Sequence, residues 1–253
     1  MAALFMCAAS SICYAIRMDT KALFSLFFHL FWPEHCPVCG RIGAAYCPEC
    51  LMSVADPLRP FCLSCGMPWK DSCCAEPVPC YALAYHEGYA REFLLNLKYH
   101  NSRSLGVAMG RLMGERLPRI EADVIVPVPL HKNSTRAYNQ TLLLARGVSD
   151  VQKISCEDVL RWRSDFGRQV EKRGHERLSL PLGSMEANNM LNGKRVVLVD
   201  DVYTTGGTLT AARAAITESG GRVAGALVWT RSIKRGDTDE WSDVKDALSL
   251  ELR

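Results

Sequence analysis

Two neighbouring acids, Asp200 and Asp201, follow four apolar residues and precede a glycine-rich turn. The apolar run at residues 196–199 is typical of a buried strand. Such a strand would deliver both carboxylates to the carboxyl edge of a parallel sheet, where ligands of open α/β folds bind. Because burying two unpaired carboxylates would be costly, we expect them to face solvent, a ligand or a cation.

The turn that follows the acids predicts a phosphate site. It leads into a helical pattern, so unpaired backbone amides and the positive end of the helix would converge on one point. The glycines let the backbone approach a ligand closely, and the threonine hydroxyls add donors. No Lys follows the glycines, which excludes a Walker loop, and the spacing differs from that of a dinucleotide loop. The residues of this turn are Thr204, Thr205, Gly206, Gly207 and Thr208.

The acids and the turn together predict a site for ribose 5-phosphate. Carboxylates would repel the phosphate itself, so they suit a ligand whose neutral hydroxyls can donate to them. The 2- and 3-hydroxyls of a ribose 5-phosphate meet this description. The sequence identifies no base that would activate a nucleophile, so it predicts binding more directly than turnover.

Nine of the twelve cysteines lie between Cys36 and Cys80. The first two C-x-x-C pairs are seven residues apart, a spacing at which four thiolates can converge tetrahedrally on Zn²⁺. Redox dithiols or isolated thiols are the alternative, but paired units in an enzyme-sized chain favour structural metal in a reducing compartment. The predicted ligands of this first site are Cys36, Cys39, Cys47 and Cys50.

An internal repeat predicts a second zinc site. The CPVCG segment recurs as CLSCG at Cys62 and Cys65, and Cys73 then matches Cys47 in spacing. Glu76 stands where a fourth cysteine would recur. The third and fourth ligands of the second site therefore stay open among Cys73, Cys74 and Cys80.

Apolar spacing predicts the elements that carry these residues. Residues 89–100 and 105–117 have the periodicity of helices, and the β-branched run at 123–130 indicates a buried strand. A further helix is expected over residues 135–148. Its N-cap would be one of three polar residues: Asn133, Ser134 or Thr135.

The clearest local pattern lies at residues 194–229, which predict strand, tight loop, helix and strand. The two strands of such a unit should be parallel. Residues 149–191, by contrast, are polar and lack a clear core face, so we expect them to form an excursion from the sheet.

The segment VVLVDDVYTTGGT resembles the motif with which type I phosphoribosyltransferases bind phosphoribosyl diphosphate (PRPP). Together with VPVPLHKNSTRAYNQ, LKYH and the paired C-x-x-C units, it resembles the ComF family, also labelled GntX or amidophosphoribosyltransferase-like, from about residue 22 to 231. The resemblance implies an α/β fold with a parallel sheet flanked by helices, preceded by a small double zinc ribbon. It also implies structural Zn²⁺, Mg²⁺-dependent PRPP binding, pentosyl transfer, and a link to DNA uptake in competence or to DNA as a nutrient.

The same resemblance implies residues on the pyrophosphate side of the site. The family's Arg-Gly-Phe-Asn-Gln element is matched except that Ala137 and Tyr138 replace Gly and Phe. Leu180 stands where the family's hood has Asn, which leaves closure over a base open. An ordinary solvated helix face is the alternative for these charges. The residues assigned to this side are Lys98, Lys132, Arg136, Asn139, Gln140, Gln169 and Arg177.

Length and composition set the domain plan. A chain of 253 residues, 48% of them hydrophobic, can bury one α/β core and carry a small module. Residues 1–16 are apolar but contain no Lys or Arg and are too short to span a bilayer, so we expect no stable membrane insertion and a cytoplasmic location. The expected parts are a non-native extension at 1–17, a helix plus double zinc ribbon at 18–80, a phosphoribosyltransferase-like domain at 81–233 and a charged tail at 234–253.

Two other functions share these features. A net charge of +3 is too mild to argue for nucleic-acid binding by itself. Residues 131–177, however, contain ten Lys or Arg against six Asp or Glu. The chain could therefore be a non-catalytic single-stranded DNA-binding or scaffold protein that uses the phosphate loop and the ribbons, with DNA-uptake or helicase proteins as partners. A PRPP-sensing regulator without turnover is the third alternative.

Overall fold

A computed structural model describes residues 35–99, 102–130, 134, 138–163, 183–188 and 190–232. All of these fall in one compact unit, His35–Arg253. The expected extension at 1–17 and the expected tail at 234–253 lie outside the described residues. Within the described part, no helix is both long and apolar enough to cross a membrane.

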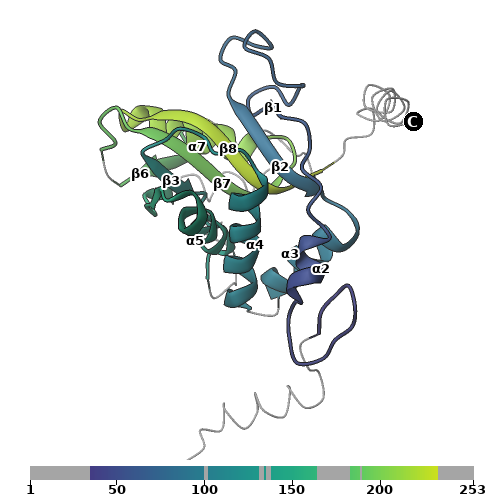
Figure 1. The fold of residues 1–253 in the computed structure, drawn as a ribbon. Helices are drawn as coiled ribbons and strands as arrows, with labels where there is room; N and C mark the ends of the chain where they lie inside the picture. The colour runs from purple at the N-terminus through teal and green to yellow at the C-terminus, as the bar shows by residue number, and fades with distance from the viewer. Residues whose placement is uncertain are drawn as a thin grey trace, which may run out of the picture. The chain divides into compact units, whose positions relative to one another are not determined.

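A six-stranded sheet with the order β1-β2-β8-β7-β3-β4 organises the fold (Figure 1). The β1 strand pairs antiparallel with β2, and every other neighbouring pair is parallel, which confirms the predicted α/β class. The strands are β1 (Phe61–Cys62), β2 (Pro79–Tyr85), β3 (Val124–Pro127), β4 (Ser155–Cys156), β7 (Arg195–Tyr203) and β8 (Arg222–Arg231).

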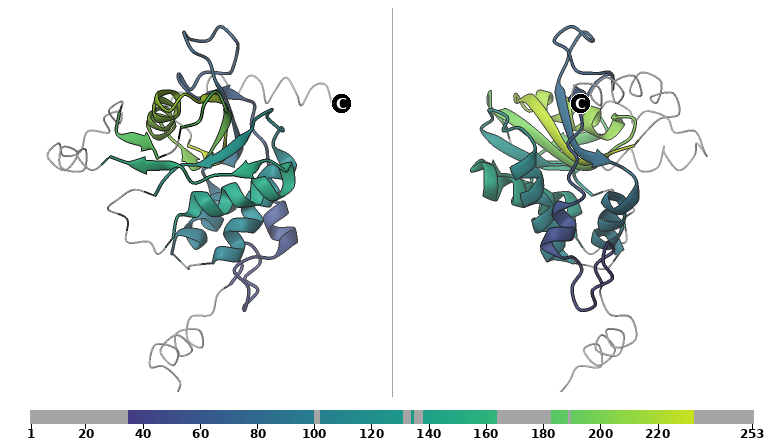
Figure 2. Two further views of the ribbon diagram at one scale, coloured as in Figure 1. Left: turned by 90° about the vertical axis from the view of Figure 1, so that its left-hand side faces the viewer. Right: turned by 45° about the vertical axis from the view of Figure 1, so that its right-hand side comes forward.

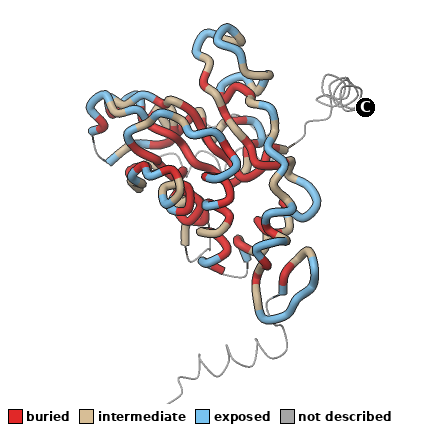
Figure 3. Tube along the Cα trace, viewed as in Figure 1, coloured by how far each residue is buried: buried red, intermediate tan, exposed pale blue. Residues whose placement is uncertain are grey.

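The predicted strand–helix–strand unit is present, with α7 (Gly207–Glu218) joining β7 to β8. Side chains of β7 alternate between two apolar cores, as the period of two in a strand requires. Val196 and Leu198 enter the core that α7 closes, whereas Val197 and Val199 enter the opposite core. Burial on both faces explains why the strand is a continuous apolar run (Figure 3).

Three helices close the second core, on the face opposite α7 (Figure 2). Two of them approach closely: a Cβ added at Gly110 would lie 2.1 Å from the carbonyl oxygen of Leu144, and one at Gly147 would lie 2.3 Å from that of Val107. Glycine at both positions therefore permits the contact that holds these helices together. The three helices are α3 (Gly88–Tyr99), α4 (Arg103–Arg116) and α5 (Gln140–Gln152).

The start of α5 differs from the prediction. The N-cap is Asn139, whose side-chain oxygen accepts from the Thr141 amide at 3.2 Å. Its side-chain amide also donates to the Val128 carbonyl at 3.1 Å, which ties the helix start to the loop after β3. The predicted caps at Asn133, Ser134 and Thr135 are wrong. The N-cap is Asn139 instead, because its side chain both caps the helix and contacts this loop.

The expected excursion from the sheet at 149–191 is wrong for residues 149–156, whereas the two strands described after them lie outside the six-stranded sheet. The α5 helix runs to Gln152, and β4 then joins the sheet beside β3. The β5 strand (Leu160–Trp162) pairs antiparallel with β6 (Met185–Ala187) in a separate two-stranded sheet. Leu160 and Met185 are fully buried, so these short strands do have a core face.

The cysteine-rich segment and the sheet share one fold. Its only described helix is α2 (Pro48–Met52), in which Leu51 is buried. The expected boundary after residue 80 falls inside β2, where Cys80 is paired with Ala226 of β8. The segment therefore reaches the sheet directly through β1 and β2.

Candidate functional site

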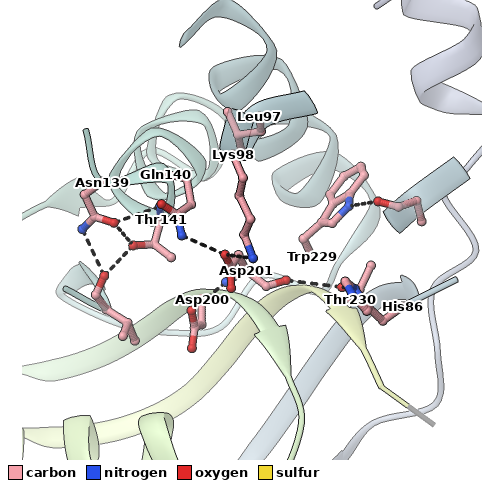
Figure 4. Close-up of polar contacts among 12 residues, drawn as sticks. His86, Leu97, Lys98, Asn139, Gln140, Thr141, Asp200, Asp201, Trp229 and Thr230 are labelled. Carbon is pink, nitrogen blue, oxygen red and sulfur yellow. Dashed lines mark hydrogen bonds and ion pairs between the residues drawn. The ribbon is translucent and has the colours of Figure 1, made fainter. Parts of the chain in front are cut away.

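Asp200 and Asp201 lie near the carboxyl end of β7 and are only 7% and 9% exposed. They do not face solvent. Asp201 faces a cation, because Lys98 Nζ lies 2.8 Å from its Oδ2 atom (Figure 4). Gln140 Nε2 donates to the same oxygen at 2.9 Å. Residues from α3 and α5 thus stabilise one of the two predicted sugar-binding acids.

The carboxylate of Asp200 has fewer stabilising contacts than that of Asp201 among the described residues. Its Oδ1 atom accepts from the Asp201 amide at 2.7 Å. Burial, and next the charge of Asp201, raise the pKa of Asp200 well above its ordinary value, although that amide and Lys98 act in the opposite direction. An ionised Asp200 is therefore costly in this structure and would gain from any partner that donates hydrogen bonds.

The turn after the acids forms the start of α7 as predicted. Gly206 is the N-cap, with a left-handed φ of 80°, and no side chain caps this end of the helix. The first amides of a helix have no intrahelical acceptor, and the helix dipole adds partial positive charge there. Thr204 and Thr205 are exposed beside it. The turn therefore has donors for an anion, and its role in binding phosphate stays a prediction.

Glycine at position 206 is required for two reasons. The left-handed backbone disfavours side chains. In addition, an added Cβ would lie 2.8 Å from Tyr203 Oη and 2.9 Å from the carbonyl oxygen of Leu63. The turn is consequently packed against Leu63 of the cysteine-rich segment.

The predicted pyrophosphate side is described only in part. Lys98 and Gln140 meet at Asp201, and Asn139 caps α5 beside them. The Oε1 atom of Gln140 is buried and has no hydrogen-bond partner among the described residues. Among these residues it is an unused acceptor next to the acids. Four of the predicted residues lie outside the described residues: Lys132, Arg136, Gln169 and Arg177.

Two residues at this edge were missed by the sequence analysis. Thr230 Oγ1 lies 3.5 Å from the carbonyl oxygen of Asp201, and His86 Nδ1 lies 2.8 Å from that hydroxyl. Burial, followed by the charges of Lys98 and Arg91, lowers the pKa of His86, so its ring is neutral at pH 7. The available signal was position: both residues lie at or just after the carboxyl ends of parallel strands.

The cysteines form two groups, and in each group all the sulfur atoms lie within 4.8 Å of one another. Four thiolates at such separations fit Zn²⁺ in a closed structural site. The second group selects Cys74 and excludes Cys80, whose side chain is fully buried within β2. The first group is Cys36, Cys39, Cys47 and Cys50, and the second is Cys62, Cys65, Cys73 and Cys74.

Both groups begin with the same turn, as the internal repeat predicts. The Gly40 amide donates to the Cys36 carbonyl at 2.9 Å, and the Gly66 amide donates to the Cys62 carbonyl at 2.8 Å. Both glycines have a positive φ, 70° and 74°. Burial raises the pKa of each leading thiol, but backbone amides outweigh it and lower the pKa of Cys36 and Cys62 to about 6. The turns therefore favour the thiolate, the form that binds metal, at these two leading cysteines. Burial and the neighbouring thiols instead raise the pKa of the other shifted thiols of the two groups, those of Cys47, Cys50, Cys65 and Cys74.

The chain is similar to several known proteins. Residues 144–248 match the family described as "Phosphoribosyl transferase domain". The chain is 26% identical to Competence protein ComFC of Bacillus subtilis over 218 residues, covering 83% of this chain and 79% of that protein. It is 23% identical to Competence protein ComFC of Streptococcus pneumoniae over 184 residues, covering 72% of this chain and 79% of that protein.

A solved adenine phosphoribosyltransferase from Thermoanaerobacter pseudethanolicus is also similar, with a TM-score of 0.36 and 16% identity over 53% of this chain and 83% of that chain. A TM-score this low carries no weight by itself. The strand order, the matched family and the two cysteine groups instead define the class: an α/β protein with a type I phosphoribosyltransferase domain and a cysteine-rich N-terminal segment. By sequence, the chain is similar to the ComFC proteins, and its residues 144–248 match the phosphoribosyl transferase domain family.

Proposed function

We propose that this protein binds PRPP, or a related ribose 5-phosphate ester, together with Mg²⁺. The observation that carries the proposal is the placement of Asp200 and Asp201 near the end of β7, a short turn before the N-terminus of α7, which no side chain caps. The amides of residues 204–208 would hold the 5-phosphate, and the two carboxylates would accept from the 2- and 3-hydroxyls of the sugar.

The contacts of the acids support a site that changes partner when ligand binds. In this state Lys98 offsets the charge of Asp201, and Gln140 donates to the same oxygen. Ribose hydroxyls would replace Lys98 as donors, so its ammonium could pair with the diphosphate instead. The Oε1 atom of Gln140, which has no hydrogen-bond partner in the described part of the chain, would serve as an acceptor for a hydroxyl or for water on Mg²⁺. Mg²⁺ would itself be held mainly by diphosphate oxygens and water.

We further propose that the bound ester undergoes phosphoribosyl transfer. A nitrogen nucleophile would displace pyrophosphate from C1 of the ribose, and positive charge near the leaving group would stabilise its negative charge. Lys98 is the described side chain best placed to contribute. His86 is neutral at pH 7 and lies at the same edge, but its bonded partner is Thr230, so we assign it no proton transfer.

Calorimetry tests the binding proposal. Wild-type protein titrated with PRPP in the presence of Mg²⁺ should release or absorb measurable heat. The Asp200→Asn/Asp201→Asn variant should bind at least about 100-fold more weakly, because two charge-assisted acceptors are lost. Asp158→Asn, which removes a partly exposed acid paired with Arg161, is the matched control and should bind like wild type. Absence of heat with wild type, or equal affinity in the double variant, would overturn the proposal. Detection of released pyrophosphate separates an enzyme from a sensor.

A link to DNA uptake is the broader part of the proposal, and the names of the two ComFC relatives motivate it. Structural Zn²⁺ in the ribbons and free thiols suit a reducing compartment such as the cytoplasm. The competing function is non-catalytic binding of single-stranded DNA, alone or with uptake or helicase proteins. A gel shift over a salt series discriminates, since real phosphate contacts weaken steeply as salt rises. A salt-sensitive shift in the absence of PRPP binding would favour the competing function.

A further inference from the structure

The second cysteine group lies against residues 204–208, the turn proposed to bind phosphate and called the phosphate loop below. Tyr203, the last residue of β7, donates its hydroxyl to the carbonyl of Leu63 at 3.2 Å. Leu63 is fully buried and stands between two of the group's cysteines, Cys62 and Cys65. A Cβ added at Gly66, in the same turn, would lie 3.2 Å from the Tyr203 hydroxyl. The turn that holds the group therefore touches the residue from which the phosphate loop begins.

An arginine of α7 makes a second connection to this group. Arg213 Nη1 donates to Ser64 Oγ at 2.8 Å and to the carbonyl oxygen of Glu76 at 3.1 Å. Its Nη2 atom donates to the carboxylate of Glu76. The guanidinium thus joins the helix that follows the phosphate loop to both ends of the segment between Ser64 and Glu76.

Glu76 explains why the internal repeat is imperfect. The repeat predicts a cysteine here, equivalent to Cys50 of the first group. Cys74 supplies the fourth sulfur of the second group, which leaves Glu76 to pair with Arg213. The departure from the repeat therefore replaces a metal ligand with a contact to α7.

Arg231, at the end of β8, adds a third connection. Its guanidinium carbon lies 4.2 Å from the centroid of the Phe61 ring, and its Nη2 atom donates to the Gly66 carbonyl at 2.9 Å. Phe61 also packs edge-on against Tyr203, with ring centroids 4.6 Å apart. Residues from β7, α7 and β8 thus all contact the turn or its flanking residues.

We propose that metal binding by the second cysteine group positions the phosphate loop, with Tyr203 and Arg213 as positioning residues. The inference rests on the proposed function of that loop. A segment with little regular structure depends on its metal for a fixed conformation. Once fixed, it restricts Tyr203 and α7, and so the amides that would hold the phosphate. Metal and ligand are then coupled, and each must tighten the binding of the other by the same factor.

The first experiment leaves every cysteine in place. In the full-length, zinc-loaded protein, Arg213→Met should keep its zinc, bind PRPP with Mg²⁺ about tenfold more weakly, and exchange the amides of residues 203–212 faster in hydrogen–deuterium exchange. Glu76→Gln should do the same to a smaller degree, and Arg213→Lys should recover part of the affinity. The matched control is Arg111→Met, whose side chain is exposed and pairs with Asp150 at 2.9 Å. It should match wild type in both readouts.

The second experiment measures the coupling from the metal side. Equilibrium competition with a zinc chelator should show that saturating PRPP tightens one of the two zinc sites about tenfold. The effect should persist in Cys47→Ser/Cys50→Ser, which disrupts the first group, and vanish in Cys73→Ser/Cys74→Ser. A zinc affinity that PRPP does not change would overturn the inference, as would wild-type exchange of residues 203–212 in Arg213→Met. The exchange comparison needs no ligand, so it still tests the positioning if wild type fails to bind PRPP and the proposed function falls.

Discussion

The two cysteine groups are built alike but differ in what surrounds them. Each begins with a C-x-x-C-Gly turn closed by the same backbone hydrogen bond. Cys36 and Cys47 of the first group belong to the core that α3, α4 and α5 close. The turn of the second group places Leu63 in the core that α7 closes. The repeat thus gives each face of the sheet its own cysteine group.

The difference between the faces divides the candidate site. The face with the first group supplies side chains to the acids, namely Lys98 and Gln140. The face with the second group supplies the backbone of the phosphate loop and the residues packed behind it. A change on the first face should therefore alter the acids, and a change on the second face should alter the loop.

Among the single substitutions that compare the two faces, Gly206→Ala should have the largest effect, because it acts where the loop meets the second group. The added Cβ would collide with Tyr203 Oη and the Leu63 carbonyl, in a backbone conformation that disfavours alanine. We expect PRPP affinity to fall about 100-fold and the free energy of unfolding to fall by about 2 kcal/mol. Gly220→Ala, at the other end of α7, has the same φ of 80° but no atom closer than 3.6 Å. The Gly220→Ala variant should be less stable than wild type, and calorimetry should show an unchanged affinity for PRPP.

Lys98→Met tests the opposite face. Removing the ammonium leaves the largely buried Asp201 without its cation, which should lower the free energy of unfolding by about 2 kcal/mol in urea titrations. If Lys98 also pairs with the diphosphate, affinity for PRPP should fall more than affinity for ribose 5-phosphate. Lys194→Met removes a more exposed pair with Glu157 and should cost less than 1 kcal/mol, roughly. Equal losses in the two variants would contradict this assignment.

Gly66→Ala and Gly40→Ala compare the two turns at the same position. Both glycines have a positive φ, so each substitution should destabilise the fold by about 1 kcal/mol. The Cβ at position 66 would press on the Tyr203 hydroxyl, whereas the Cβ at position 40 would meet no atom within 4 Å. We expect a fivefold to tenfold loss of PRPP affinity, roughly, only for Gly66→Ala. Similar binding by the two variants would remove the distinction between the groups.

Asp200→Asn should lower the affinity for PRPP and slightly raise the free energy of unfolding. The folded-state pKa of Asp200 lies above the ordinary value of 3.8, so the folded protein holds this proton more tightly than the unfolded chain does. Its contribution to stability is complete below that ordinary value and is lost as the pH rises toward the folded-state pKa. The variant should therefore be more stable than wild type near pH 8 and differ little from it near pH 4 in denaturant titrations. A constant difference across this range would contradict a raised pKa.

The sequence predicted local features well because their signals are local. The apolar run, the acids and the glycine turn of residues 196–208 lie within one strand and one helix start, and the structure has them as expected. The first four cysteines were likewise found from spacing alone. The start of α5 was missed because Asn133, Ser134 and Thr135 are as suitable for capping as Asn139. Only the loop after β3 distinguishes them.

Features that depend on distant contacts could not be predicted in this way. The contact of Lys98 with Asp201 joins residues from α3 and β7, and that of His86 with Thr230 joins residues after β2 and in β8. The choice of Cys74 over Cys80 depends on β2, which buries Cys80 in the sheet. The strands β5 and β6 have only three residues each, so neither shows a clear periodicity. They are also far apart in sequence, so no local signal reveals their pairing.

A crystal structure of the protein with PRPP and Mg²⁺ tests the central claim most directly. The account predicts the 5-phosphate against the amides of residues 204–208, the ribose hydroxyls on Asp200 and Asp201, and Lys98 turned from Asp201 toward the diphosphate. A ligand bound elsewhere, with the Lys98–Asp201 pair intact and the turn at Gly206 unoccupied, would contradict it.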